Sequence, residues 1–510
     1  MGAAPIETEL KFLLEPEAAA DLLAHPALQG EEHTDRLRSV YFDTAERDLR
    51  CAGFGLRVRR TGGGFVQGLK RQDGAGAVSR QEWESPVPGE AVDAALLQDT
   101  PAHAILDGRA LAPVFSTTVK RLSRLCRAEG VLIEASLDAG EVSVGGRSEP
   151  IHELELELKD GDVHALFALG RQLAADFSVR LSFESKAERG YRLADKDDLA
   201  ARASADAPLS ADLCAAEAFQ RIARACLAQV CANAEVLRRV RRPEAVHQMR
   251  VGLRRLRAAF AAFKPMLADR RLNVVEAELK WLAGELDRAR DIDVFVQSTF
   301  RPAAAEMSDA ALAPLGRQLL KAQSAAYDRA LKAATSRRYA VLTVEAAAWI
   351  EAGRWTTLKD PVLTALRARP AREFAIEALD HLRRVVRRRG HDLANLDHVS
   401  RHKLRIRAKR LRYATEFFAP LFEDAGKSQS KFLRALKRMQ DRLGELNDLA
   451  VARDRILRDA GLRTPELALA AGRLIGRREK SEKALLDEAV EEYDRFRAAP
   501  AFWREAADAS

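Results

Sequence analysis

Two different patterns of apolar and polar positions divide the chain. Up to about residue 195, segments such as IETELKFLL, FGLRVRR and IHELELELK alternate apolar and charged residues. Successive side chains of a strand point to opposite sides, so this period of two predicts strands with one apolar and one charged face. From about residue 213 the alternation stops, and Leu, Ala and Arg recur with the spacing of long helices.

Glycine and proline mark the expected boundaries between these elements. The glycines at 62–64 and 145–146 stand where hairpin turns are needed. Short helices fit at 16–25, 88–99 and 161–176. Prolines are expected to break the long helices of the second half, at Pro243, Pro265, Pro302, Pro361, Pro370 and Pro420.

We therefore expect a multidomain α+β protein. A β domain spans 4–195, a polar linker spans 196–212, and an all-α domain spans 213–500. The all-α domain contains an internal repeat, with copies at about 213–355 and 370–500. The repeat is clearest where VHQMRVGLRRLRAAFAAF resembles SRHKLRIRAKRLRYATEFF with an offset of 155 residues. Such self-similarity predicts two copies of one helical unit.

Composition narrows the class of protein. The 510 residues are 47% hydrophobic, which excludes disorder as the dominant state. The sequence contains no long uncharged apolar run that would predict a membrane span, and the N-terminus has no secretory pattern. Five cysteines form no C-x-x-C pair, which fits a reducing compartment. We expect a cytoplasmic protein without a membrane partner.

The net charge of +8 hides a split along the chain. Residues 1–200 hold 24 basic and 34 acidic side chains, and residues 201–510 hold 59 and 41. The first part is therefore acidic by 10 charges and the second basic by 18. The basic part indicates a polyanionic partner, although a solubilising surface is the plain alternative.

Charged residues of both signs recur on one face of the expected strands. Acidic ladders with i, i+2 spacing repel unless cations lie among them. A closed sheet with a polar lumen would bring the two signs together, whereas an open sheet would expose them to solvent. The motifs that carry this pattern are Glu7, Glu9 and Lys11; Arg57 and Arg59; and Glu153, Glu155 and Glu157.

The ordered set of these motifs resembles the CYTH, or triphosphate tunnel metalloenzyme, family. The resemblance covers about residues 4–195. The landmarks in chain order are Glu7-x-Glu9-x-Lys11, Tyr41-Phe42-Asp43-Thr44, Arg57-x-Arg59, Lys70, Arg80 with Glu82, Arg121, Asp138, Glu153-x-Glu155-x-Glu157, Ser185-Lys186 and Arg189-Gly190-Tyr191.

The resemblance implies an eight-stranded antiparallel β-barrel that forms a tunnel for a triphosphate. It implies Mg²⁺ or Mn²⁺ as cofactor and a catalytic set of Lys11, Glu9, Arg57 and Arg59, with Lys11 near the attacked phosphoryl group. The implied phosphate contacts are Arg57, Arg59, Lys70, Arg80, Arg121, Lys186 and Arg189. The implied metal ligands are Glu7, Glu9, Glu155 and Glu157, with Glu153 and Asp138 as further candidates.

Two helices of the second half gather cations on one side. On a helical projection, His247, Arg250, Arg254 and Arg257 fall within about 80° of arc, opposite an apolar side. The second copy repeats the pattern with His402, Arg405, Lys409 and Arg412. Like charges this close are destabilising without a nearby anion. Acids on neighbouring helices could supply part of that charge.

This duplicated pattern resembles the CHAD domain over about 213–500. The resemblance implies binding of inorganic polyphosphate, with Lys280 and Lys437 as further contacts. A nucleic acid backbone is a competing phosphate chain, but few aromatic residues are interleaved for base stacking. Nucleic acid is therefore disfavoured, and the oligomeric state stays open.

The leading hypothesis is a metal-dependent triphosphatase that acts on inorganic triphosphate, with a helical domain that binds polyphosphate. Adenylate cyclase or thiamine triphosphatase activity in the same tunnel is one alternative, and a non-catalytic polyphosphate-granule protein is another.

Three weaker signals are set aside. Gly426-Lys427-Ser428 lacks the first glycine and the preceding strand of a P-loop. His398 and His402 have the spacing of a zinc pair, but the first copy has no counterpart for His398. The run of arginines at 387–389 is interpreted as a solvated helix end.

Overall fold

The structure is a computed structural model. It describes residues 6–71, 79–128, 130–197, 200–203, 209–306, 312–459 and 482–504, and single positions 465 and 472; at 6, 7, 79, 80, 128 and 448–459 it describes the backbone only. Two compact units divide the chain. The first comprises Met1–Asp206, Arg224–Met249 and Ala333–Gly353, and the second comprises Ala207–Ala223, Arg250–Lys332 and Arg354–Ser510.

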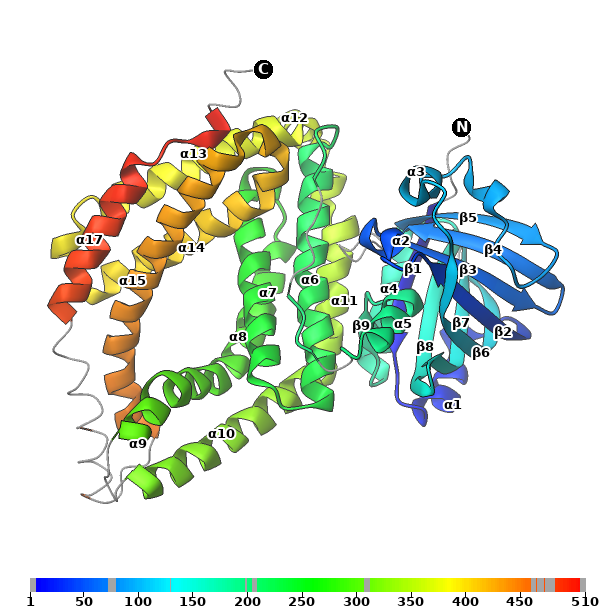
Figure 1. Cartoon of the computed structure of the whole chain (residues 1–510), viewed down its shortest axis with the longest axis horizontal. Coiled ribbons are helices and arrows are strands. Elements are labelled where there is room, and N and C mark those ends of the chain that lie inside the picture. Colours follow the sequence, from blue (N-terminus) through cyan, green and yellow to red (C-terminus); the bar gives the residue numbers. More distant parts are fainter. Residues whose placement is uncertain are drawn as a thin grey trace. The chain divides into compact units, whose positions relative to one another are not determined.

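A nine-stranded antiparallel sheet dominates the N-terminal region (Figure 1). The strands are β1 (Ile6–Leu13), β2 (Glu31–Asp43), β3 (Phe54–Thr61), β4 (Gly64–Arg71), β5 (Ser79–Val87), β6 (Ala112–Ala128), β7 (Val131–Val144), β8 (Arg147–Asp160) and β9 (Arg180–Ser182). Their order is β5-β4-β3-β2-β6-β7-β8-β1-β9. The expected α+β class, with strands first and helices afterwards, is confirmed.

The sheet rolls up, but it does not close along its whole length. Strand β1 pairs with β8 on one edge, while its other edge is divided between β5 and β9. The β1–β5 contact joins Ile6–Thr8 to Ser79–Gln81 only. The expectation of a fully closed eight-stranded barrel is therefore wrong in this detail. Strand β9 takes the place beside the second half of β1 that full closure would give to β5.

The alternation of the sequence separates the two faces of this sheet. Leu10 and Phe12 of β1 are buried on the outer face. They lie close to Gly170 of helix α4 (Val163–Asp176), where an added Cβ would come within 3.0 Å of Leu10. The turn between β7 and β8 uses Gly145 and Gly146 with φ of 53° and 78°, a conformation that glycine adopts without a steric cost.

Short helices complete the β domain. They are α1 (Ala18–Leu23), α2 (Asp48–Cys51), α3 (Ala102–Leu106) and α5 (Lys186–Ala194), in addition to α4. The helices expected at 16–25 and 161–176 correspond to α1 and α4. The segment expected at 88–99 contains a single 3-10 turn, Ala94–Leu97.

The rest of the described chain is helical (Figure 1). The helices are α6 (Ala215–Arg239), α7 (Pro243–Ala262), α8 (Arg271–Phe295), α9 (Arg301–Glu306), α10 (Leu312–Ala334), α11 (Arg337–Ala352), α12 (Pro361–Ala368), α13 (Ala371–Gly390), α14 (His398–Phe418), α15 (Gly426–Asp459) and α17 (Glu482–Ala498). Pro243 and Pro361 begin helices and Pro370 precedes one, as expected for a residue without a backbone N–H. None of the described helices combines the length and apolarity that a bilayer-spanning helix needs.

Aromatic residues at equivalent places in the two repeats pack together. The rings of Phe263 and Phe219 lie 5.4 Å apart, and those of Phe263 and Phe374 stack at 4.9 Å. Phe418 lies 5.4 Å from Phe263. The 155-residue offset relates Phe219 to Phe374 and Phe263 to Phe418, so each repeat gives the same two positions to one core.

Candidate functional site

The inner face of the rolled sheet encloses a charged cavity of about 220 Å³. Alternation along each strand brings side chains of both signs to this face. The cationic lining residues are Lys11, Arg57, Arg59, Lys70, Arg121, Lys159 and Lys186. The acidic lining residues are Glu9, Glu82, Glu84, Glu134, Glu155 and Glu157. The cavity therefore brings together most of the tunnel residues that the sequence predicts.

One wall of the cavity is organised around Glu82. This carboxylate is buried, and it accepts hydrogen bonds from Arg57 Nη2 at 2.9 Å and Lys70 Nζ at 3.1 Å. Arg57 also contacts Glu84 Oε1 at 3.2 Å. Burial alone would lower the pKa of Arg57, but Glu82, Tyr41 and Glu84 raise it. Arg57 and Lys70 are thus held in place as fixed positive charges.

Arg59 differs from its neighbour Arg57. Its Nε lies 3.4 Å from the hydroxyl of Ser39, and it forms no ion pair with a carboxylate in the described part of the chain. Burial and the positive charges of Arg57 and Arg121 lower the pKa of Arg59 to about 10. A partly buried guanidinium in this state is stabilised when an anion enters the cavity.

Strands β7 and β8 hold a buried cluster of three carboxylates. Asp138, Glu153 and Glu155 place oxygens within 4.8 Å of one another. Lys186 Nζ lies 2.8 Å from Asp138, 2.9 Å from Glu153 and 2.8 Å from Glu155. Lys11 Nζ lies 3.2 Å from Glu155 and 3.7 Å from Glu153.

The electrostatics of this cluster follow from its lysines. Burial alone would raise the pKa of Glu153, but Lys186, Lys11 and Arg189 outweigh burial and lower it to about 2. The pKa of Glu155 is likewise lowered, against burial, by Lys186, Lys11 and Arg121. Burial opposes the charge on Lys186 too, yet the carboxylates raise its pKa. Glu153 and Glu155 are therefore ionised near neutral pH.

The spacing of the carboxylate oxygens in this cluster suits a metal ion. The cations that surround them make a metal ion less favourable. Four cations, Lys11, Lys186, Arg121 and Arg189, already contact its three carboxylates. A divalent ion there would have to displace the Lys186 ammonium. Asp138 and Glu153 are fully buried and do not line the cavity, so these two candidate ligands are committed to ion pairs.

A second row of carboxylates has the donor set for a hard cation. Glu9 pairs in register with Glu157, which pairs in register with Glu134 on the next strand. All three line the cavity. Lys159 Nζ lies 2.7 Å from Glu157 and 3.1 Å from Glu134, so these two acids share one cation. Carboxylate oxygens in such a row suit Mg²⁺ or Mn²⁺.

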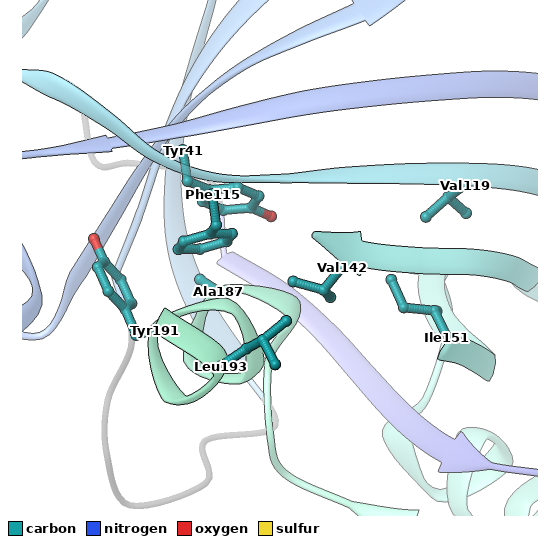
Figure 2. Packing of buried hydrophobic residues seen from close by; sticks show 8 residues of the cluster. All are labelled: Tyr41, Phe115, Val119, Val142, Ile151, Ala187, Tyr191 and Leu193. Atoms are coloured by element: carbon teal, nitrogen blue, oxygen red, sulfur yellow. The ribbon is translucent and has the colours of Figure 1, made fainter. Parts of the chain in front are cut away.

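Helix α5 is clamped where its first residue, Lys186, enters the cavity. Ser185 and Glu188 form a capping box at the helix start. Figure 2 shows how Ala187 and Tyr191 pack with Phe115 in the buried cluster beside the strands. The Tyr191 hydroxyl donates to Asp43 Oδ2 at 2.7 Å, and burial together with this bond raises the pKa of Tyr191.

The Tyr191–Asp43 contact explains two sequence landmarks. Asp43 is fully buried and also accepts the backbone N–H groups of Thr44, Leu49 and Arg50. The aspartate of the Tyr-Phe-Asp-Thr motif and the tyrosine of the Arg-Gly-Tyr motif are thus joined by a hydrogen bond and have a structural role. Neither residue lines the cavity.

Arg189 lies behind the cavity wall. It is 2% exposed, and its Nη2 lies 2.9 Å from Glu153 Oε1. Glu149 is also buried, and it pairs with Arg192 at 3.0 Å and with Arg239 of α6 at 2.8 Å. The structure therefore places Arg189 as a support for Glu153, outside the cavity lining, whereas the sequence predicted a phosphate contact.

The basic helices pack through shared acids. Arg255 of α7 and Arg412 of α14 both contact Glu416, at 3.3 and 3.1 Å. Arg250 pairs with Asp287, and His402 Nδ1 lies 2.6 Å from Asn447 Oδ1.

Arg254 and Arg257 make no ion pair with a carboxylate among the described residues, and each has a buried Nε without a hydrogen-bond partner. Lys280 and Lys437 are exposed on α8 and α15. The second-copy residues Arg405 and Lys409 are partly buried on α14.

Two domain families match this chain. The CYTH domain matches residues 5–191, and the CHAD domain matches residues 221–457. The chain is a CYTH domain joined to a CHAD domain. The resemblance predicted from the sequence motifs is thereby confirmed for both halves.

Known proteins match parts of this chain. A protein named Inorganic triphosphatase from Haemophilus influenzae is 31% identical over 206 residues, which is 38% of this chain and 56% of that protein. The chain thus matches little more than half of this curated relative. The crystal structure of the CHAD domain from the plant Ricinus communis is 29% identical, with a TM-score of 0.52, and covers 59% of this chain and 98% of that one.

A third match is to a plant structure. A Hippeastrum structure, described as a putative adenylyl cyclase with a dominant triphosphatase activity, covers 38% of this chain and 97% of that one. It is 18% identical with a TM-score of 0.28.

Some tunnel residues lie beyond the structural description, and others were missed. The side chains of Glu7 and Arg80 lie outside the described residues, although their backbones pair in register between β1 and β5. Sequence reasoning did not select Glu82, Glu134 or Lys159 as site residues, yet all three line the cavity of the CYTH domain. Glu82 and Lys159 lie two residues from Glu84 and Glu157, and Glu134 lies four residues from Asp138. This even spacing puts each pair on one face of its strand and is the signal that could have found them.

Proposed function

We propose that the CYTH domain hydrolyses inorganic triphosphate to diphosphate and phosphate. The observation that carries this proposal is Arg59, a partly buried guanidinium without a carboxylate partner among the described residues, in a cavity lined by further cations. A chain of three phosphates supplies the negative charge that this wall needs. The match to a protein named Inorganic triphosphatase supports the same substrate.

The residues that line the cavity of the CYTH domain would have different roles in phosphoryl transfer. Such a reaction needs charge neutralisation and in-line placement more than a covalent nucleophile. Arg57, Arg59, Lys70 and Arg121 would bind the phosphate oxygens. Lys11 extends from β1 toward the carboxylates and would bind the attacked phosphoryl group, where negative charge grows in the transition state.

The cofactor of the proposed reaction is Mg²⁺ or Mn²⁺. Glu9, Glu157 and Glu134 would hold it, with Glu155 at the edge of the same row. When bound, the ion would neutralise phosphate charge and lower the pKa of a water molecule. Lys186 keeps Glu155 ionised and in place, so its role is to orient the acidic wall and prevent repulsion among the carboxylates.

Inorganic triphosphate is favoured over a nucleotide or thiamine triphosphate by the lining of the cavity. Tyr41 is the aromatic side chain among the described lining residues, and its ring is already stacked on Phe115 at 4.5 Å. A base or thiazolium ring therefore has no free aromatic surface there. Side-by-side turnover of triphosphate, ATP and thiamine triphosphate distinguishes these substrates.

Phosphate release tests the reaction. Purified full-length chain is assayed with triphosphate and Mg²⁺, with and without EDTA. We expect metal-dependent release that Glu9→Ala reduces by about 100-fold or more. Glu141→Ala is the matched control, because Glu141 is an exposed residue of β7 that does not line the cavity. Equal activity in Glu9→Ala, or release that EDTA leaves unchanged, contradicts the proposal.

We propose that the CHAD domain binds inorganic polyphosphate through α7 and α14. The contacts would be His247, Arg250, Arg254 and Arg257 with Lys280, and His402, Arg405, Lys409 and Arg412 with Lys437. Support comes from Arg254 and Arg257, whose guanidinium groups lack a carboxylate partner among the described residues. All five cysteines are free thiols, which suits the cytoplasm, where polyphosphate granules are a candidate location.

Long-chain polyphosphate binding tests this second proposal. Arg254→Glu combined with Arg412→Glu is expected to weaken affinity by at least about tenfold, and the salt dependence should become shallower. Arg434→Glu, at an exposed position of α15, is the control. Unchanged affinity of the double variant contradicts the assignment. Polyphosphate binding with no turnover of any triphosphate would instead favour a non-catalytic binding protein.

A further inference from the structure

A second basic cavity lies at the end of helix α13 in the CHAD domain. Its volume is about 490 Å³. Arg383, Arg384, Arg387 and Arg388 of α13 line one side, and Arg497 and Arg504 of the C-terminal segment line another. A cavity of this size suits one small ligand. The C-terminal half of α13 thus contributes to a concave surface instead of a plain solvated helix end.

The positive charge of this cavity exceeds what its acid can offset. Asp380 is the carboxylate in its lining. That group is already engaged, because Arg504 contacts it and the Trp503 indole donates to it at 3.0 Å. Arg384 and Arg387 form no ion pair with a carboxylate in the described ranges. The same is true of Arg388.

Arg383 provides an independent sign that the cavity is built for an anion. It donates to the carbonyl of Ala499 at 2.6 Å, and its guanidinium lies 5.9 and 6.0 Å from the rings of Phe432 and Trp503. Its Nε is buried without a hydrogen-bond partner. Burial, followed by the positive charge of Arg387, lowers its pKa. The fold therefore holds a partly buried cation without a carboxylate partner in the described ranges at this place.

The cavity is not part of the duplicated pattern. The 155-residue offset relates its four α13 arginines to positions on α6 in the first copy, and those positions carry no charge. The pairs are Arg383 with Ala228, Arg384 with Gln229, Arg387 with Ala232, and Arg388 with Asn233. A feature present in one copy is distinct from the α7 and α14 surface, which both copies share.

We propose that this cavity binds a compact anion with three or more clustered phosphate groups. Of the six guanidinium groups, Arg504 pairs with Asp380 and Arg497 pairs with Asp494. The four that remain exceed the charge of a single phosphate, and arginine matches phosphate oxygens with two parallel hydrogen bonds. The ligand is a short inorganic phosphate chain or a polyphosphorylated ring, since both present the same clustered phosphates. This site is separate from the CYTH cavity and from the proposed polyphosphate contacts.

Hydrogen–deuterium exchange on the full-length chain locates the ligand. EDTA is present to stop turnover, and the probes are sodium tripolyphosphate and myo-inositol hexakisphosphate, with sodium sulfate at equal ionic strength. At ten times the dissociation constant, binding slows local opening by about tenfold. We expect this slowing in the peptides that cover 380–392 and 493–504, with either phosphate probe.

Charge-reversal variants assign the effect to the cavity. Arg384→Glu with Arg388→Glu changes two exposed side chains, so the fold is kept, and the slowing should disappear. It should persist in Arg434→Glu and in the Arg254→Glu, Arg412→Glu double variant. No slowing with either probe overturns the proposal. Equal slowing by sulfate, or slowing that the Arg254→Glu, Arg412→Glu pair removes, overturns it as well.

Discussion

Replacing Arg59 with methionine should make the ligand-free protein more stable while removing its function. Arg59 has a hydroxyl partner, Ser39, and no carboxylate partner among the described residues. A pKa lowered from 12.5 to about 10 means that the charged side chain costs about 3 kcal/mol in the fold relative to water. Loss of the Ser39 contact and imperfect packing reduce the gain, so we expect stabilisation of about 1–2 kcal/mol.

Arg57→Met is the informative comparison, because Arg57 lies two residues from Arg59 on the same face of β3. Its guanidinium contacts the buried Glu82 at 2.9 Å. Removing it leaves Glu82 with Lys70, so we expect a loss of about 2–4 kcal/mol. Arg60→Met, at an exposed position of the same strand, should change stability by less than about 0.5 kcal/mol.

Urea unfolding followed by circular dichroism measures these differences. Each variant is unfolded with and without triphosphate in EDTA, and the shift of the urea midpoint reports binding to the folded state. Arg59→Met should show a higher midpoint alone and little further shift with triphosphate. The reasoning fails if Arg59→Met is destabilised as much as Arg57→Met. It also fails if Arg59→Met keeps the full shift produced by triphosphate.

Three further predictions follow from contacts of the buried residues Gly190, Glu149 and Glu153. Gly190→Ala should destabilise the fold by about 1–3 kcal/mol in thermal unfolding, because the new Cβ would lie 2.0 Å from the Phe115 ring. Arg239→Ala should cost about 1–2 kcal/mol in urea, because it removes a 2.8 Å ion pair from the buried Glu149. Glu153 has a folded pKa lowered to about 2, so its stabilising contribution is present above its unfolded pKa near 4.5 and is lost as the pH falls toward 2. Urea midpoints measured from pH 6 to pH 3 should therefore fall less steeply in Glu153→Gln.

The alternation along the sequence predicted which face of the sheet each tunnel residue occupies, but not how deeply its side chain is buried. Glu153, Glu155 and Glu157 share one face of β8, as the alternation indicates. Glu155 and Glu157 line the cavity, whereas Glu153 is buried against Arg189 and Lys186. Depth depends on where α5 crosses the sheet, and a period of two contains no information about that helix.

The local sequence pattern also did not predict how the sheet closes or that the arginine run lines cavities. The pairing of β1 with both β5 and β9 is set by contacts far apart in the chain. The arginines at 387–389 are exposed at the end of α13, as expected, but Arg387 and Arg388 also line one cavity and Arg389 lines another. A helix end lines a cavity only when other segments of the chain pack beside it.

The seam between β1 and β5 is a weak point of the tunnel wall. Three residue pairs join these strands, whereas the β7–β8 ladder runs from Leu132 opposite Asp160 to Val144 opposite Arg147. Separating β5 from β1 breaks fewer backbone hydrogen bonds than parting any long ladder. Thermal breathing should therefore concentrate at this junction, and β1 amides near Thr8 should exchange with solvent sooner than those of the β7–β8 hairpin.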